Sequence, residues 1–153
     1  MVRVVFVCLG NICRSPLGEG VFKELLREKG LEDQFVVDSA GTADYHIGKL
    51  PDPGSRRVAV KKGFSIDDQR ARQFKSTDLN EWDYVIAMDA SNRENIEKLG
   101  KVAGELHMMR DFDPEGNGDV PDPYQLDDSA FDNVHTIIRR SCEKLLDHIL
   151  SKR

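Results

Sequence analysis

Residues 7–16 read VCLGNICRSP, and five residues separate the first cysteine, Cys8, from the arginine, Arg14. The apolar run that ends at Val7 predicts a buried strand, and a helical pattern follows from Ser15 onward. Gly10 and Asn11 tolerate a positive φ, so the loop between strand and helix can curl with its N–H groups inward. A loop of this kind in front of a helix N-terminus binds anions.

The chemistry of this loop follows from its cysteine and its arginine. The positive field that binds an anion also stabilises a thiolate, and the planar fork of Arg14 can hold two phosphate oxygens. We therefore expect Cys8 to attack the phosphorus of a phosphate monoester while Arg14 binds the equatorial oxygens. The alternative is a chance spacing in which Gly10 and Asn11 simply mark a turn.

Composition narrows the class of protein. A chain of 153 residues with 39% hydrophobic and 32% charged residues fits one globular domain, residues 1–153. The net charge of −5 argues against a nucleic-acid binder. No apolar run reaches the roughly 18 residues of a membrane span, and the N-terminus lacks a signal-peptide cleavage site. Three cysteines without a disulfide framework indicate a reducing cytoplasm.

Apolar runs alternate with helical patterns along the chain. Strands are expected at residues 4–7, 35–37, 82–88 and 105–109. Helices are expected from Ser15 as N-cap to Gly30, from Pro53 to Gly63, after Asp89 with Ile96 and Leu99 facing inward, and over residues 131–149. This alternation predicts an α/β fold with a parallel sheet flanked by helices on both faces.

Three polar segments interrupt these elements. Residues 38–42, DSAGT, are expected to form a loop at a strand's carboxyl end, where open α/β sheets bind ligands. Residues 65–75 carry alternating charges that indicate a solvated face. Residues 111–125 form a loop rich in Asp, Gly and Pro.

Four motifs together resemble the low-molecular-weight protein tyrosine phosphatase family. They are CLGNICRSP at 8–16, DSAGT at 38–42, MDASN at 88–92 and DPY at 122–124. Their order and approximate spacing match the family over nearly the whole chain. The resemblance implies a single-domain, phosphotyrosine protein phosphatase I-like fold with a four-stranded parallel sheet. It also implies hydrolysis of phosphotyrosine in proteins, and of small aryl phosphates, through a phosphocysteine, with no metal or other cofactor.

The resemblance also implies a role for each motif residue. Cys8 would be the nucleophile, Arg14 would bind phosphate, and Asp122 would protonate the leaving oxygen and then activate water. A hydrogen-bond network would support the loop through Asn11, Ser15 and Ser39. The resemblance also implies a set of residues that contact the phosphate or line a cleft too deep for phosphoserine, two of which also support the loop. They are Leu9, Gly10, Asn11, Ile12, Cys13, Ser15, Tyr45 and Tyr124.

Composition alone leaves the identity of the acid open. Equal candidates in or beside the 111–125 loop are Asp113, Asp119, Asp127 and Asp128. Tyr124 favours Asp122, because a ring next to the acid can line a substrate slot.

Two departures and two further cysteines need an interpretation. Gln69 precedes Arg-Ala-Arg where many relatives have histidine, and the glycines Gly18 and Gly20 indicate a packing variation in the first helix. Cys13 is either a small apolar residue or, as the resemblance implies, the partner of Cys8 in a reversible disulfide under peroxide. Cys142 is expected in the core.

Other functions of this fold fit the sequence less well. An arsenate reductase would carry redox cysteines between Cys13 and Cys142, and a phosphoarginine phosphatase would carry threonine at Ile12. A non-enzymatic phosphate-binding module would more naturally lack Cys8 or Asp122. The four histidines show no ligand spacing with Cys8 or Cys13, so no metal site is predicted: His46, His107, His135 and His148. The expected partners are tyrosine-phosphorylated proteins, and inorganic phosphate is expected to be both product and inhibitor. The protein is expected to be a monomer that binds neither membranes nor nucleic acids.

Overall fold

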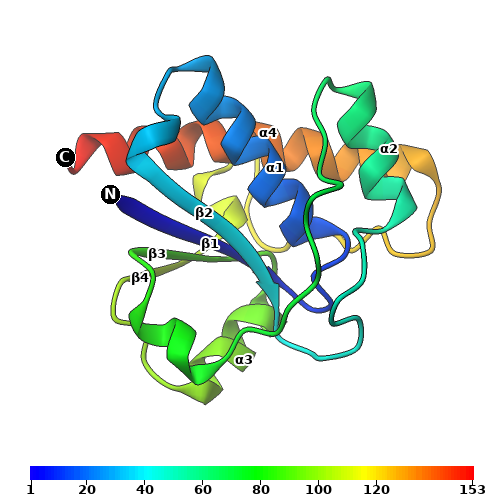
Figure 1. Ribbon diagram of the computed structural model, residues 1–153. Helices are drawn as coiled ribbons and strands as arrows, with labels where there is room; N and C mark the ends of the chain where they lie inside the picture. Colours follow the sequence, from blue (N-terminus) through cyan, green and yellow to red (C-terminus); the bar gives the residue numbers. More distant parts are fainter.

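A computed structural model describes residues 1–153 and shows one parallel sheet (Figure 1). Its strand order is β2-β1-β3-β4. The strands are β1 (Val2–Cys8), β2 (Phe35–Gly41), β3 (Tyr84–Ala87) and β4 (Glu105–Met108). All three neighbouring pairs are parallel, so the predicted four-stranded α/β fold is confirmed.

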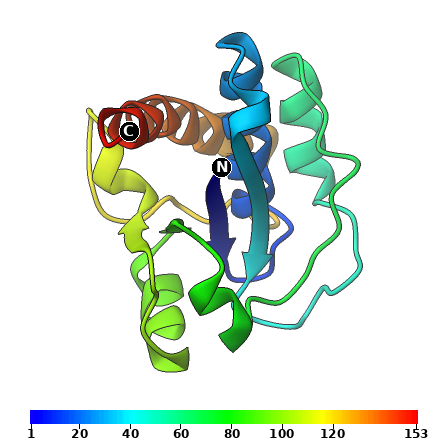
Figure 2. The same ribbon diagram turned by 60° about the vertical axis from the view of Figure 1, so that its left-hand side comes forward.

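Helices cover both faces of the sheet (Figures 1 and 2). One face carries α1 (Arg14–Glu28), α2 (Pro53–Lys61) and the long C-terminal α4 (Asp128–Ser151). The opposite face carries α3 (Ala90–Leu99). Short 3-10 helices form at Glu32–Gln34, Ser76–Asn80 and Met109–Phe112. None of the helices is long and apolar enough to cross a membrane.

The central strand β1 divides the core in two. Val4 and Phe6 pack into the large cluster under α1 and α4, whereas Val5 and Val7 pack into a smaller cluster with Ile96 of α3. Because both faces of β1 are covered from Val4 onward, residues 4–8 form a continuous apolar run and not an alternating one.

The two unusual glycines of α1 let the helix pack closely, Gly18 against the sheet and Gly20 against the segment that follows α2. A Cβ atom on Gly18 would lie 2.8 Å from Cε of Met88, and one on Gly20 would lie 2.5 Å from Cγ2 of Ile66. This close packing agrees with the interpretation of Gly18 and Gly20 as a packing variation.

Two predicted boundaries at the loop are wrong. Helix α1 begins at Arg14 with Cys13 as N-cap, so Ser15 is not the cap; its hydroxyl is used inside the loop instead. Strand β2 continues to Gly41, which pairs with Cys8, so residues 38–41 are strand and not loop. Tertiary pairing with β1 outweighs the turn-forming character of these residues.

Two further expectations need correction, whereas the caps predicted at the other helix ends are confirmed. Leu99 is exposed because α3 ends there, and Arg72 in the supposed solvated segment forms ion pairs with Asp38 and Asp78. Asp89 caps α3 as predicted, and Cys142 is fully buried. Gly30 and Gly63 follow the ends of their helices at positive φ.

Candidate active site

The loop between β1 and α1 forms the floor of a cavity of about 210 Å³ at the carboxyl end of the sheet. Nine of the predicted site residues line it, together with His46: Cys8, Leu9, Gly10, Ile12, Cys13, Arg14, Tyr45, Asp122 and Tyr124. The other three predicted residues, Asn11, Ser15 and Ser39, are buried and interact with one another beside the loop. The fold therefore brings every predicted site residue to one place.

Two backbone features give the loop its curled shape. Asn11 adopts the left-handed region at φ 57°, as its residue type permits. Gly41 of β2 lies so close to the loop that a Cβ atom there would meet the Leu9 carbonyl oxygen at 2.7 Å and the Asn11 nitrogen at 3.1 Å. The loop therefore depends on the absence of a side chain at position 41.

The loop's carbonyl groups are held from outside by residues 42–55. Four bonds do this: Thr42 N to Cys8 O (2.9 Å), Ala43 N to Leu9 O (2.9 Å), Asp52 N to Ile12 O (2.7 Å) and Ser55 Oγ to Cys13 O (3.1 Å). The backbone N–H groups of residues 9–13, in contrast, donate to no acceptor in the protein. These free donors and the N-terminus of α1 together offer the features by which proteins bind anions.

The thiol of Cys8 sits in this loop, 3% exposed, with its Sγ atom 3.0 Å from Oγ of Ser15. Asn11 donates from Nδ2 to the same Ser15 oxygen over 2.8 Å. The Ser15 hydroxyl has two groups to which it can donate, Sγ of Cys8 at 3.0 Å and the Ala40 carbonyl oxygen at 3.4 Å.

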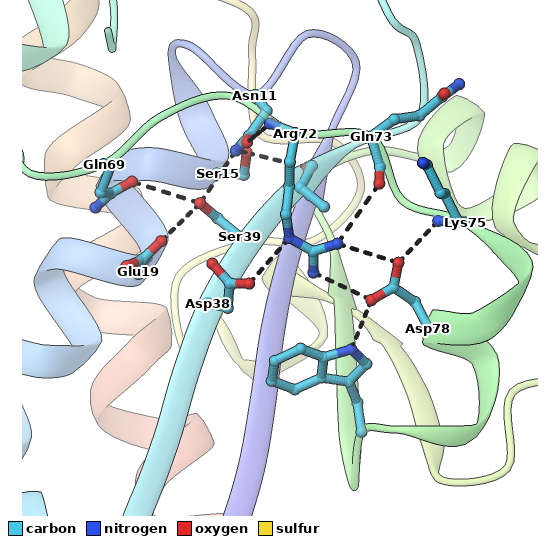
Figure 3. A network of polar contacts seen from close by, with 12 residues as sticks. Asn11, Ser15, Glu19, Asp38, Ser39, Gln69, Arg72, Gln73, Lys75 and Asp78 are labelled. Carbon is cyan, nitrogen blue, oxygen red and sulfur yellow. Dashed lines mark hydrogen bonds and ion pairs between the residues drawn. The ribbon is translucent and has the colours of Figure 1, made fainter. Parts of the chain in front are cut away.

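A buried polar network extends from Asn11 toward α1 (Figure 3). Asn11 Nδ2 also donates to Ser39 Oγ over 3.0 Å, and Ser39 donates to Oε1 of Glu19 over 2.7 Å. Burial raises the pKa of Glu19, although Lys23 and Ser39 oppose that shift. Gln69 donates to the Pro16 carbonyl over 3.1 Å and so ties its segment to α1.

The network extends from Asn11 in a second direction as well (Figure 3). The backbone nitrogen of Arg72 donates to Asn11 Oδ1 over 3.0 Å. Its guanidinium bridges Asp38 at 2.9 Å and Asp78 at 3.1 Å. Burial alone would raise the pKa of Asp78, but the bonds from Arg72, Lys75 and Trp82 lower it below the usual range. The ion pairs of Arg72 thus hold in place the residue whose backbone N–H binds Asn11 Oδ1, while Asn11 Nδ2 binds Ser15.

Arg14 is buried, and its charge is held by two acceptors. Nη1 donates to Asp89 Oδ2 over 2.7 Å and to the Val120 carbonyl over 2.9 Å. Burial opposes the charge, yet Cys8 and Asp89 raise the pKa of Arg14 above the ordinary arginine value. Sequence reasoning predicted Asp89 only as a helix cap. The MDASN motif that contains Asp89 was the available sequence signal for its contact with Arg14.

Among the candidate acids only Asp122 lines the cavity. Its Oδ2 lies 3.8 Å from Nη2 of Arg14, and its Oδ1 accepts a bond from the Tyr124 nitrogen over 3.1 Å. The others have structural partners: Asp113 pairs with Arg110 and Arg140, Asp119 accepts from Ala90 N, Asp127 caps α4, and Asp128 pairs with Arg57. The geometry therefore separates Asp122 from residues that composition could not distinguish.

Aromatic rings form the rim of the cavity. Tyr45 is 67% exposed and Tyr124 is 43% exposed. The His46 ring lies near both, with centroid distances of 6.3 Å to Tyr45 and 6.2 Å to Tyr124. Sequence reasoning considered His46 only as an isolated histidine, and no local signal marked it as a rim residue.

Cys13 lines the same cavity but differs from Cys8 in its electrostatics. Burial, with added repulsion from Asp52 and Cys8, raises the pKa of Cys13 far above that of a free thiol. Cys13 is therefore a neutral thiol at physiological pH. All three cysteines are free, so the reversible pairing of Cys8 with Cys13 stays a prediction.

Comparisons with known proteins agree with this geometry. Residues 3–153 match the sequence model of the family described as low molecular weight phosphotyrosine protein phosphatase. The chain is 40% identical over 156 residues to the low molecular weight protein-tyrosine-phosphatase YfkJ of Bacillus subtilis, covering 100% of this chain and 99% of YfkJ. It is 36% identical over 151 residues to PtpA of Staphylococcus aureus, covering 98% of this chain and 95% of PtpA.

A solved structure gives the same result at the level of the fold. The crystal structure of a protein tyrosine phosphatase from Entamoeba histolytica superposes with a TM-score of 0.95 at 33% identity, covering 99% of each chain. Family match, full-length relatives and fold agree, and the chain belongs to the low-molecular-weight phosphotyrosine protein phosphatase family.

Proposed function

We propose that this protein-tyrosine phosphatase hydrolyses phosphotyrosine in proteins, and small aryl phosphates, through a phosphocysteine on Cys8. One observation carries the proposal: the sulfur of Cys8 lies in a loop whose N–H groups at residues 9–13 have no protein acceptor. The buried charge of Arg14 lines the same cavity. A dianionic phosphate bound there would meet the nucleophile directly.

In the first step the Cys8 thiolate attacks phosphorus, and the bond from phosphorus to the phenolic oxygen breaks. Asp122, in its protonated form, gives its proton to that oxygen, so tyrosine leaves neutral. Arg14 and the free N–H groups bind the three non-bridging oxygens, where charge is held in the transition state.

In the second step water attacks the phosphorus of the phosphocysteine. Asp122, now a carboxylate, takes a proton from this water, and the bond from sulfur to phosphorus breaks. The hydroxyl of Ser15, 3.0 Å from Sγ, stabilises the departing thiolate. Inorganic phosphate is the product, and it inhibits because it fits the same loop.

Selectivity for phosphotyrosine follows from the depth and lining of the cavity. Tyr45 and Tyr124 stand at its rim, while Leu9 and the nearly buried Ile12 add apolar wall. An aryl ring reaches the loop between these side chains, whereas a phosphoserine side chain is too short. The apolar Ile12 side chain favours an aromatic ring over the polar guanidinium of phosphoarginine.

We also propose that the protein acts as a monomer in the cytoplasm and without a cofactor. Its three cysteines are free and buried, which suits a reducing compartment. Each step of the reaction above is assigned to a side chain or backbone group of a single chain. Its substrates would be tyrosine-phosphorylated proteins.

The proposal is tested by comparing three substrates in the presence of a metal chelator. A phosphotyrosine peptide, a phosphoserine peptide and a phosphoarginine peptide are given to the wild type, to Cys8→Ser and to Cys142→Ala. We expect turnover of phosphotyrosine by the wild type and by Cys142→Ala, and none by Cys8→Ser. The proposal would be contradicted if the wild type hydrolysed the phosphoserine or phosphoarginine peptide faster than the phosphotyrosine peptide, or if Cys8→Ser were active.

A further inference from the structure

A cluster of two histidines and one glutamate lies outside the cavity described above. Nε2 of His107 is 2.7 Å from Oε1 of Glu105, and Nε2 of His148 is 3.1 Å from the same oxygen. One ligand-type atom from each of the three residues lies within 4.8 Å of the others. Two imidazoles thus converge on a single carboxylate oxygen.

The fold creates this cluster from two distant segments. Glu105 and His107 lie two residues apart on the edge strand β4, so their side chains share one face of the sheet. His148 lies in the last turn of α4. Figure 1 shows the C-terminal end of α4 next to the N-terminus, at the end of the sheet away from the carboxyl end of β1 that holds Cys8. The cluster is therefore separate from the phosphatase site.

The two imidazole rings are packed in place but reachable from solvent. The Phe112 ring lies 5.0 Å from the His107 ring and 5.2 Å from the His148 ring, measured between centroids. The two histidine rings are 5.5 Å apart at an interplanar angle of 80°. The side chains of His107, His148 and Glu105 are 26%, 29% and 33% exposed, so an ion from solution can reach them.

The two oxygens of the Glu105 carboxylate have different partners. Nε2 of His107 and Nε2 of His148 both contact Oε1. Lys152 Nζ contacts the second carboxylate oxygen, Oε2, at 2.9 Å. Oε1 therefore faces the histidines while Oε2 faces a cation, which would compete with a metal ion for the same carboxylate.

We propose that Glu105, His107 and His148 form a binding site for a divalent transition-metal ion of the Zn²⁺ class. Two imidazole nitrogens and one carboxylate oxygen are a donor set that Zn²⁺ takes, leaving one position for water. Ligand atoms at zinc distances and tetrahedral angles are about 3.3 Å apart. The 2.7 and 3.1 Å separations must therefore widen by about 0.6 and 0.2 Å.

Binding requires both imidazoles to be neutral, with their remaining protons on Nδ1 and the Nε2 lone pairs directed at the ion. The ion then links β4 to the last turn of α4. The inference is independent of the phosphatase chemistry, since none of these three residues lines the cavity at Cys8.

Calorimetric titration with Zn²⁺ tests the site in a Cys8→Ser/Cys13→Ser background, which removes the cavity thiols as competing ligands. We expect one Zn²⁺ per chain and a higher unfolding midpoint with Zn²⁺, but no such shift with Mg²⁺, which prefers oxygen ligands. In the same background, His148→Gln lowers the affinity at least about tenfold and abolishes the shift. Lys152→Met raises the affinity, because it removes the competing cation from Glu105.

His135→Gln is the matched control, because His135 lies on the same helix but packs against Phe64. It leaves the Zn²⁺ affinity of the background unchanged. The proposal is overturned if the background protein binds no Zn²⁺ saturably, or if His148→Gln binds it as tightly as the background. Should His148→Gln fail to fold, Glu105→Gln gives the same decision.

Discussion

Nη1 of Arg14 lies 2.7 Å from Oδ2 of Asp89, which joins the phosphate-binding loop to the N-terminus of α3. The same Nη1 donates to the carbonyl of Val120, two residues before Asp122. A single buried guanidinium therefore fixes its own direction and the start of the segment that carries the acid. Arg14 organises the site as well as carrying positive charge into it.

Replacing Asp89 should separate its effect on the orientation of Arg14 from its effect on stability as the N-cap of α3. Asp89→Asn keeps an acceptor for the Asn92 N–H at the cap of α3 but removes the anion beside Arg14. We expect kcat to fall at least about tenfold with little change in stability, because the guanidinium loses its orientation. Asp89→Ala should show the same kinetic loss and cost a further ~0.5–2 kcal/mol of stability through loss of the cap.

Steady-state kinetics and denaturant unfolding measure both effects. Asp127→Asn makes the same change at the cap of α4, away from the cavity, and should leave kcat unchanged. Full activity in Asp89→Asn would show that Arg14 is oriented without it.

Asp122→Ala should reveal the acid through the leaving group. With a phosphotyrosine peptide, kcat is expected to fall about 10²- to 10⁴-fold, the usual contribution of general acid–base catalysis. The loss should be smaller for an aryl phosphate with an acidic phenol, because that leaving group requires less protonation. Asp128→Ala, which removes only a surface ion pair with Arg57, is the control. Equal losses for good and poor leaving groups would refute the acid role.

Gly41 and Gly20 should respond differently to alanine. At Gly41 the new Cβ would meet backbone atoms of Leu9 and Asn11, so Gly41→Ala should distort the loop and lower kcat/KM by more than about tenfold. At Gly20 it would meet the side chain of Ile66, so Gly20→Ala should cost ~1–3 kcal/mol by overpacking while the folded enzyme stays active. Unfolding curves and activity per folded molecule distinguish the two outcomes. Wild-type activity in Gly41→Ala would mean that the loop tolerates this contact.

His135 should make stability depend on pH. Burial, with help from Lys62 and Arg139, lowers the pKa of His135 from 6.5 to about 4. Between these values the unfolded chain binds a proton that the folded protein does not, so stability present above pH 6.5 is lost as the pH falls toward 4. The loss is at most about 3 kcal/mol.

Denaturant unfolding of the wild type and of His135→Gln at several pH values measures this contribution. The variant lacks the titrating group, so its unfolding free energy should fall less between pH 7 and 4. Carboxylates such as Asp113 titrate in both proteins and cancel in the comparison. Identical slopes in the two proteins would exclude His135 as the cause.

Local patterns predicted the parts of the site that are local in the sequence. The apolar run before Cys8 predicted the central strand, and the residues from Cys8 to Arg14 predicted the anion loop. Both signals lie within a few residues, where strand propensity and backbone freedom decide the outcome.

Tertiary contacts decided what the sequence could not predict. Ser15 has the residue type of a helix cap, yet its hydroxyl is taken by Cys8 and Asn11. The contact between Arg14 and Asp89 joins residues 75 positions apart, and no spacing rule reports it. The cluster of His107 and His148 likewise exists only because the last turn of α4 contacts Glu105 of β4.

The central claim is that Cys8 carries the phosphoryl group during turnover. It is tested most directly by rapid chemical quenching of the enzyme during turnover of an aryl phosphate labelled in its phosphoryl group, followed by peptide mapping. The account predicts label bound to Cys8, with a burst of phenol equal to the enzyme concentration and no label in Cys8→Ser. Turnover at the wild-type rate without label on Cys8, or with label on another residue, would contradict it.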